Sequence, residues 1–141
     1  MRYLGLDLGS RTLGISISDV TCSIASTLKT IRFDDSCYDS LIPIIKEIID
    51  EFKISKIILG FPKNMNGTIG ERGNICLEFR EKLVNELNIE VVMQDERLST
   101  VEATNYMIKA DMSRKKRKQK VDSLAANIIL QTYLDKEKGR L

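Results

Sequence analysis

The stretch "YLGLDLGSRTLGISISD", residues 3–19, holds two runs of alternating apolar residues on either side of a short polar turn. It predicts a β-hairpin with strands at residues 2–8 and 13–19. In the first strand the leucines share one face, and Asp7 lies on the other face between two glycines. The glycines leave room beside Asp7 for an ion, a backbone or a helix. A turn aspartate that accepts backbone N–H bonds is the simpler alternative.

The rest of the chain continues this hairpin into an α/β pattern. Apolar runs and helical stripes follow one another, so an antiparallel meander of three strands should lead into two parallel strands. We therefore expect one domain, residues 1–141, with a mixed five-stranded sheet flanked by helices. The further strands are predicted at 23–32, 56–61 and 89–94, and the helices at 38–52, 71–87, 99–111 and 121–137.

The composition limits the chemistry available to the protein. Its 141 residues contain no histidine, which excludes Ser-His-Asp catalysis and imidazole metal ligands. Acid–base or metal chemistry must then use carboxylates, which favour hard cations such as Mg²⁺ and Mn²⁺. Three widely spaced cysteines indicate reduced thiols in a cytoplasmic protein. Neither a signal peptide nor an apolar run of the ~20 residues that span a bilayer is visible, so no membrane association is expected.

Four carboxylates lie where such chemistry would be expected. Asp95 and Glu96 follow the strand 89–94, and Asp122 begins the final predicted helix, with two alanines one turn later on its own side. Small residues there would let the helix approach the sheet, so that Asp122 points towards Asp7 and Glu96. The structural alternatives are that Asp95 helps to start the next helix and that Asp122 is an N-cap. Acids that converge in this way are typical of a site for one or two divalent cations, since bound metal offsets their repulsion.

The segment "RKKRKQK", Arg114 to Lys120, is basic at every position but one. Most charge runs of this kind are solvated loops, whereas the functional alternative is a phosphate-binding segment. The net charge of the whole chain is only +2. The residues themselves therefore leave the two interpretations evenly balanced.

Four stretches together resemble the YqgF/RuvX family of bacterial proteins. They are "LGLDLGSRTLGISISD", "IILGFPKNMNGTIGER", "VVMQDERLST" and "KVDSLAANIILQTYL", and they occur in family order. The resemblance implies an RNase H-like, resolvase-like fold. It also implies a metal-dependent nuclease, either in 5′-end maturation of pre-16S rRNA or as a Holliday junction resolvase acting on DNA. "DLGSRTLG" alone is also similar to the phosphate-binding hairpin of actin-like ATPases. An actin-like nucleotide-binding domain and a non-catalytic nucleic-acid-binding factor therefore stay as alternatives.

The resemblance also implies roles for individual residues. Asp7, Glu96 and Asp122 would be the catalytic residues and the ligands of Mg²⁺ or Mn²⁺, with Asp95 as the ambiguous neighbour of Glu96. The partner would be structured RNA, namely pre-rRNA on the ribosomal subunit, or branched DNA. The sequence carries no signal for the oligomeric state. The residues themselves suggest nucleic-acid contacts in the hairpin turn, where Arg11 could equally pair with a carboxylate, and beside the polar loop after residue 61. The resemblance adds the basic run to these contacts. The expected contacts are Arg11, Lys63, Asn64, Arg72, Arg114, Lys115, Lys116, Arg117, Lys118 and Lys120.

Overall fold

The computed structural model describes residues 1–62, 66–95 and 114–139, and in residues 114–123 it describes the backbone alone. The elements are β1 (Arg2–Leu8), β2 (Thr12–Ser18), β3 (Ala25–Arg32), the 3₁₀ helix η1 (Tyr38–Ser40), α1 (Leu41–Phe52), β4 (Ile54–Phe61), α2 (Glu71–Leu87), β5 (Glu90–Asp95) and α4 (Arg114–Glu137). The helix predicted at 99–111 lies outside the described residues.

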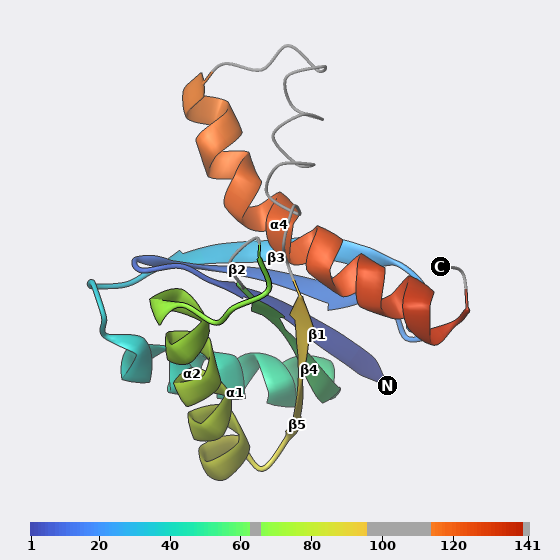
Figure 1. Ribbon diagram of the computed structural model, residues 1–141. Helices are drawn as coiled ribbons and strands as arrows, with labels where there is room; N and C mark the ends of the chain where they lie inside the picture. The colour runs from blue at the N-terminus through green and yellow to red at the C-terminus, as the bar shows by residue number, and fades with distance from the viewer. Residues whose placement is uncertain (63–65, 96–113, 140–141) are drawn as a thin grey trace.

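The described strands form a five-stranded sheet in the order β3-β2-β1-β4-β5 (Figure 1). β1, β2 and β3 pair antiparallel, whereas β1, β4 and β5 pair parallel. This confirms the predicted mixed sheet. Since the three parallel strands run the same way, their C-terminal ends lie at one edge, where the active sites of open α/β sheets gather.

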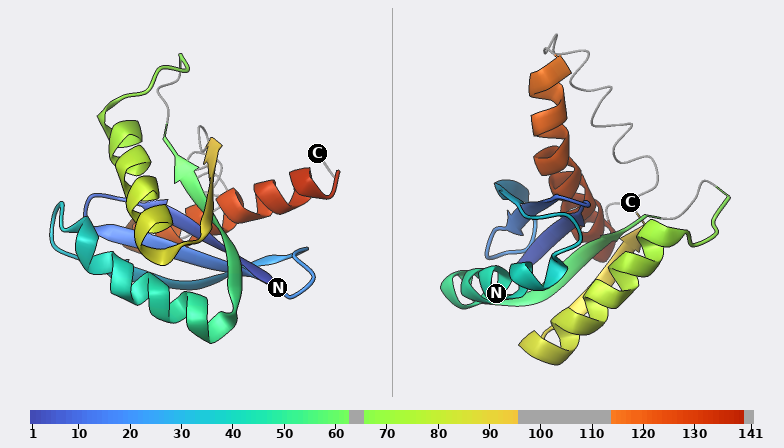
Figure 2. Two further views of the ribbon diagram at one scale, coloured as in Figure 1. Left: turned by 90° about the horizontal axis from the view of Figure 1, so that it is seen from below. Right: turned by 90° about the vertical axis from the view of Figure 1, so that its left-hand side faces the viewer.

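Helices cover both faces of the sheet. α1 and α2 lie on one side and α4 on the other, as Figure 1 and the right-hand view of Figure 2 show. The core against α1 and α2 contains the β1 leucines Leu4, Leu6 and Leu8, as the alternation predicts. A smaller core joins α4 to the other face through Ile129, Leu130 and neighbouring residues.

α4 lies very close to β1, because the residues between them are small. A Cβ atom placed on Gly5 would lie 2.7 Å from Leu130 Cβ and 3.1 Å from the Ala126 carbonyl oxygen. That carbonyl accepts a hydrogen bond of 2.9 Å from the buried Ser16 hydroxyl. Ala125 and Ala126 are both buried. The predicted close approach of this helix to the sheet is therefore confirmed.

Several element boundaries differ from the prediction, and two of these differences concern the predicted acids. α4 begins at Arg114, so the basic run forms its first turns and Asp122 lies inside the helix instead of at its start. Lys, Arg and Gln have high helix propensity, and the segment contains neither Gly nor Pro to stop the helix. β5 also runs one residue further, so that Asp95 ends this strand instead of following it. The first turns of α4 project away from the sheet (Figures 1 and 2).

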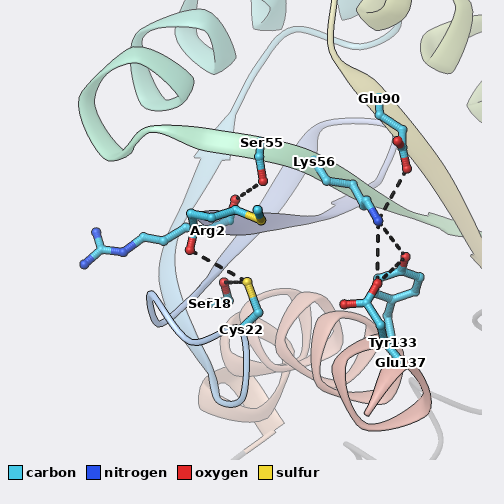
Figure 3. A network of polar contacts seen from close by, with 9 residues as sticks. Arg2, Ser18, Cys22, Ser55, Lys56, Glu90, Tyr133 and Glu137 are labelled. Atoms are coloured by element: carbon cyan, nitrogen blue, oxygen red, sulfur yellow. Dashed lines mark hydrogen bonds and ion pairs between the residues drawn. The ribbon is translucent and has the colours of Figure 1, made fainter. Parts of the chain in front are cut away.

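A polar cluster joins the other end of α4 to the sheet (Figure 3). The Lys56 ammonium lies 3.1 Å from the Tyr133 hydroxyl, 3.4 Å from a Glu90 carboxylate oxygen and 3.6 Å from one of Glu137. It also lies 4.8 Å from the centre of the Tyr3 ring. Burial lowers the pKa of Lys56, but the Tyr133 hydroxyl and the nearby negative charge outweigh it and raise the pKa overall. The cluster therefore anchors α4 with Lys56 charged.

The turn between β2 and β3 is organised by Asp19. Its carboxylate accepts hydrogen bonds from the Thr21 hydroxyl and from the backbone N–H groups of Ser23 and Ile24. These bonds favour the charged form, Thr21 most of all, and lower the pKa of Asp19 to about 2.

Asp19→Asn should therefore reduce thermal stability at pH 5 and have less effect at low pH. The pKa of Asp19 is lower in the folded chain than in the unfolded chain. The stability that its charge contributes is thus complete above the ordinary carboxyl pKa and is lost as the pH falls towards 2. Circular dichroism melts of both proteins from pH 5 to pH 2 measure this. A difference in Tm that stays constant over this range would contradict the prediction.

The structure also bears on the compartment predictions. The three cysteines, Cys22, Cys37 and Cys76, are all free thiols, and the first and last are buried. In the part of the chain that is described, none of the helices is both long and apolar enough to cross a bilayer.

Candidate active site

Asp7 lies at the edge of the sheet where the parallel strands end. It is half-buried and pairs with Gly14 of β2, so no side chain stands beside it on that strand. Residues opposite each other in an antiparallel pair point to the same face. Asp7 shares its face with Gly5, which packs against α4. The carboxylate is therefore on the α4 side of the sheet, away from the leucine core.

A side chain of α2 forms a hydrogen bond with the end of β1 next to Asp7. Arg72, in the first turn of this helix, donates a hydrogen bond of 2.8 Å from Nη2 to the Leu8 carbonyl oxygen. Its Nη1 donates to the Tyr38 hydroxyl over 3.2 Å. Gly73 lets the helix start close to β4, since a Cβ there would lie 3.1 Å from the Pro62 carbonyl oxygen. Neither Tyr38 nor the Leu8 carbonyl is among the predicted site residues, and no local pattern in the sequence indicates a role for them.

The other predicted acids are only partly described. Asp95 ends β5 opposite Phe61, with β4 between it and Asp7, so two strand spacings, roughly 10 Å, separate their backbones. Glu96 lies outside the described residues, and Asp122 is a backbone position within α4. Among the side chains that are described, no group of three potential metal ligands occurs.

The predicted nucleic-acid contacts lie in four parts of the chain. Arg11 is exposed in the turn between β1 and β2, and its carbonyl accepts a hydrogen bond from the Phe33 N–H. Arg72 makes the hydrogen bonds given above. Lys63 and Asn64 lie outside the described residues. The basic residues from Arg114 to Lys120 occupy the first turns of α4, whose side chains are not described.

The donors predicted at this edge suit a divalent metal ion. Asp7 and Asp95 are carboxylates on two of the parallel strands that end together, but they lie on opposite faces of the sheet. Asp95 continues the face of Val91 and Met93, which pack in the α1/α2 core, whereas Asp7 is on the α4 face. Carboxylate oxygens are the ligands that Mg²⁺ and Mn²⁺ prefer. Asp7 is half-buried, so a cation beside it would be only partly screened by water. Of the predicted acids whose side chains are described, Asp7 therefore fits the metal that the sequence predicts, and Asp95 does not share its face.

The mixed sheet with helices on both faces has the RNase H-like fold. Thermus thermophilus RuvC, solved in complex with a Holliday junction substrate, superimposes with a TM-score of 0.61 at 14% identity, covering 99% of this chain and 96% of that one. The fowlpox virus resolvase, also solved with Holliday junction DNA, gives 0.61 at 11% identity, covering 97% and 99%. At these identities the likeness concerns the fold alone.

The sequence relationship is much closer. Residues 1–136 match the family model described as RuvX, Holliday junction resolvase. A Bacillus mycoides protein is 50% identical over 135 residues, covering 96% of this chain and 98% of its own. A Caldanaerobacter subterraneus protein is 48% identical over 140 residues, covering 99% of each. Both carry the name "Putative pre-16S rRNA nuclease". The chain belongs to the RuvX family.

Proposed function

We propose that this protein is a metal-dependent nuclease of the cytoplasm that hydrolyses phosphodiester bonds during 5′-end maturation of pre-16S rRNA. The observation that carries the proposal is the half-buried Asp7, on the α4 face where three parallel strands end. Relatives that align along almost the whole chain carry the name of a pre-16S rRNA nuclease. The three free thiols agree with a reducing compartment.

The register of α4 supports the inclusion of Asp122 in the site. α4 runs antiparallel to β1, since the Tyr133 ring lies 6.1 Å from the Tyr3 ring whereas Ala126 lies beside Gly5. One turn back from Ala126 is position 122, and two residues on from Gly5 is Asp7. These steps are about 6 Å along a helix and about 6.6 Å along a strand. The two positions therefore fall at about the same level along the sheet.

The proposed roles follow from these positions. Asp7, Glu96 and Asp122 would hold Mg²⁺ or Mn²⁺. Of the two neighbouring acids 95 and 96, Glu96 is the proposed ligand, because Asp95 continues the face of β5 that packs against α1 and α2. When bound there, a divalent metal would supply Lewis-acid chemistry, which can activate a water nucleophile and stabilise the leaving oxygen of a phosphodiester. The chain's own contribution is to hold the carboxylates rigidly on packed elements. The close contact of α4 with β1, through Ser16 and Ala126, serves that purpose.

The test is cleavage of two substrates by the purified protein in Mg²⁺. One is an rRNA precursor with its 5′ extension, and the other is a four-way DNA junction. We expect cleavage of the rRNA precursor at the mature 5′ end. The second candidate function, junction resolution, is favoured by the description of the family model. Cleavage of junctions together with inertness towards the rRNA precursor would replace the first proposal by the second.

The basic start of α4 supports a structured nucleic acid as the partner. Its first turns project from the domain, where they can reach a phosphate backbone (Figure 1). The same segment is rich in Lys and Arg, whose binding to phosphates releases counterions. We propose that Arg114, Lys115, Lys116, Arg117, Lys118 and Lys120 bind RNA, together with Arg11, Lys63 and Asn64.

Replacement of Lys115 and Lys116 by alanine should weaken RNA binding and reduce its salt dependence. Loss of two phosphate contacts lowers the slope of log Kd against log salt by roughly 1.4 to 1.8. Fluorescence anisotropy titrations from 50 to 200 mM KCl without divalent metal measure both quantities. The matched control is Lys46→Ala combined with Lys53→Ala, at exposed positions of α1 and its C-terminal end. An unchanged slope in the α4 variant would mean that Lys115 and Lys116 are solvated and do not contact RNA phosphates.

A further inference from the structure

The guanidinium of Arg72 already donates hydrogen bonds within the protein, unlike that of an exposed arginine free to bind a phosphate. The side chain is partly buried, and its guanidinium connects three elements. Nη2 donates to the Leu8 carbonyl oxygen at 2.8 Å, and Nη1 donates to the Tyr38 hydroxyl at 3.2 Å. Leu8 directly follows Asp7 and ends β1. The guanidinium therefore holds the peptide next to the proposed catalytic carboxylate.

The Leu8 carbonyl lies where the sheet itself provides no partner. The Gly9 N–H donates to the Thr12 carbonyl over 2.8 Å, so that pair faces across the hairpin. Successive residues of a strand direct their backbone groups to opposite sides, and the Leu8 carbonyl therefore points away from β2, towards β4. The β1–β4 ladder ends at Leu6. Arg72 thus supplies the hydrogen-bond donor that a longer β4 pairing would have supplied.

We propose that Arg72 is a positioning residue that fixes Asp7 through the backbone of Leu8. This proposal rests on the nuclease function proposed above and changes the role of Arg72 from a phosphate contact to a support for the site. The Tyr38 ring packs against the rings of Phe33 and Phe79, and its hydroxyl accepts the second hydrogen bond of the guanidinium. The chain from Tyr38 through Arg72 to Leu8 then keeps the end of β1 in a single place.

The chemistry of the site explains why such a support matters. A catalytic carboxylate must be held to within about 0.5 Å of its working position, and a misplacement of 1 Å can cost about a hundredfold in rate. Beyond Leu6, β1 is paired only to β2 among the described strands, so its end is the weakest part of the strand that carries Asp7. A hydrogen bond from a charged donor is the strongest simple way to restrain it.

The chain offers a matched control on the same helix. Arg80 also donates from α2 to a strand carbonyl, that of Val91, at 3.3 Å. Val91 lies near the start of β5, at the end of the sheet opposite to Asp7. Arg80→Gln therefore removes the same charge and the same kind of bond without touching the site.

The experiment compares Arg72→Gln, Tyr38→Phe and Arg80→Gln with the unchanged protein. Amide hydrogen exchange of residues 1–13 reports the mobility of β1, and Mn²⁺ titration followed by electron paramagnetic resonance reports the carboxylate site. Two further measurements are single-turnover cleavage of the rRNA precursor and RNA affinity in EDTA at several salt concentrations. Tyr38→Phe keeps the ring packing and removes one acceptor of the guanidinium, so it provides the test if Arg72→Gln does not fold.

For Arg72→Gln we expect faster exchange in β1, and a loss of about tenfold in Mn²⁺ affinity and in cleavage rate, the usual effect of removing an outer support of a metal ligand. RNA affinity and its salt slope should stay within about twofold. Tyr38→Phe should show the same changes at smaller size, and Arg80→Gln none of them.

Two results would overturn the proposal. A weaker RNA affinity with a salt slope lower by about 0.7 to 0.9 would mean that Arg72 contacts a phosphate. Faster exchange or a lower Tm, with Mn²⁺ affinity and cleavage unchanged, would mean a purely structural role. If the unchanged protein binds Mn²⁺ but does not cleave the precursor, the proposed substrate fails, whereas exchange and Mn²⁺ affinity still decide the role of Arg72.

Discussion

Asp7→Asn is expected to reduce cleavage of the rRNA precursor by about a thousandfold or more, because a metal's stabilisation of the transition state is worth several kcal/mol and each 1.4 kcal/mol is a factor of ten. The amide has nearly the same shape as the carboxylate but no charge with which to hold a cation. Asp7 is half-buried on the α4 face. We therefore expect the fold and most of the RNA affinity to survive the change.

The measurement is single-turnover cleavage in Mg²⁺, with circular dichroism and RNA binding in EDTA on the same samples. Asp50→Asn, at an exposed position of α1 on the opposite face of the sheet, is the matched control and should stay fully active. Full activity of Asp7→Asn would defeat the catalytic assignment. It would favour the view of this protein as a non-catalytic nucleic-acid-binding factor.

Gly5→Ala is expected to destabilise the protein by about 2–3 kcal/mol, since it inserts a methyl group into a closed contact. The new Cβ would lie 2.3 Å from Ser16 Oγ and 2.7 Å from Leu130 Cβ, so α4 must move away from β1. For a chain of this size, that corresponds to a fall in Tm of roughly 10 °C. Because α4 also carries Asp122, cleavage by the folded fraction should fall as well.

A double-mutant cycle separates the steric effect from a general loss of stability. Ser16→Ala removes the hydroxyl that Gly5→Ala would strike, but it also removes the hydrogen bond to the Ala126 carbonyl, at a cost of about 1 kcal/mol. The loss of unfolding free energy in the double variant should be smaller than the sum of the losses in the two single variants, because the two sites are in contact. Simple additivity, or a Tm of Gly5→Ala equal to that of the unchanged protein, would contradict the packing described for α4.

Much of the architecture could be predicted from local patterns. Alternating apolar residues placed the β1 leucines on one face and Asp7 on the other, and the structure agrees. The small residues Ala125 and Ala126 indicated a close helix–sheet contact, and they are buried there. Such predictions succeed because the period of the side chains along a strand or helix decides which of them share a face.

The start of α4 could not be predicted in the same way. The helix was predicted to begin at residue 121, with the basic run before it as either a solvated loop or a phosphate-binding segment, yet the helix already begins at Arg114. The helix propensity of Lys and Arg, together with a long apolar continuation packed on the sheet, outweighs the repulsion between neighbouring charges. The position of Asp122 within the helix follows from this result.

The sequence by itself determined the strand and helix pattern, the exclusion of histidine chemistry and the face on which Asp7 stands, because periodicity and composition are local properties. Only the tertiary structure decided that Arg72 holds the Leu8 carbonyl, 64 residues away along the chain, and that Ser16 holds α4. Contacts of this kind depend on where packed elements end relative to one another. That relation is decided by the packing of the whole sheet and its helices, and no short stretch of sequence records it.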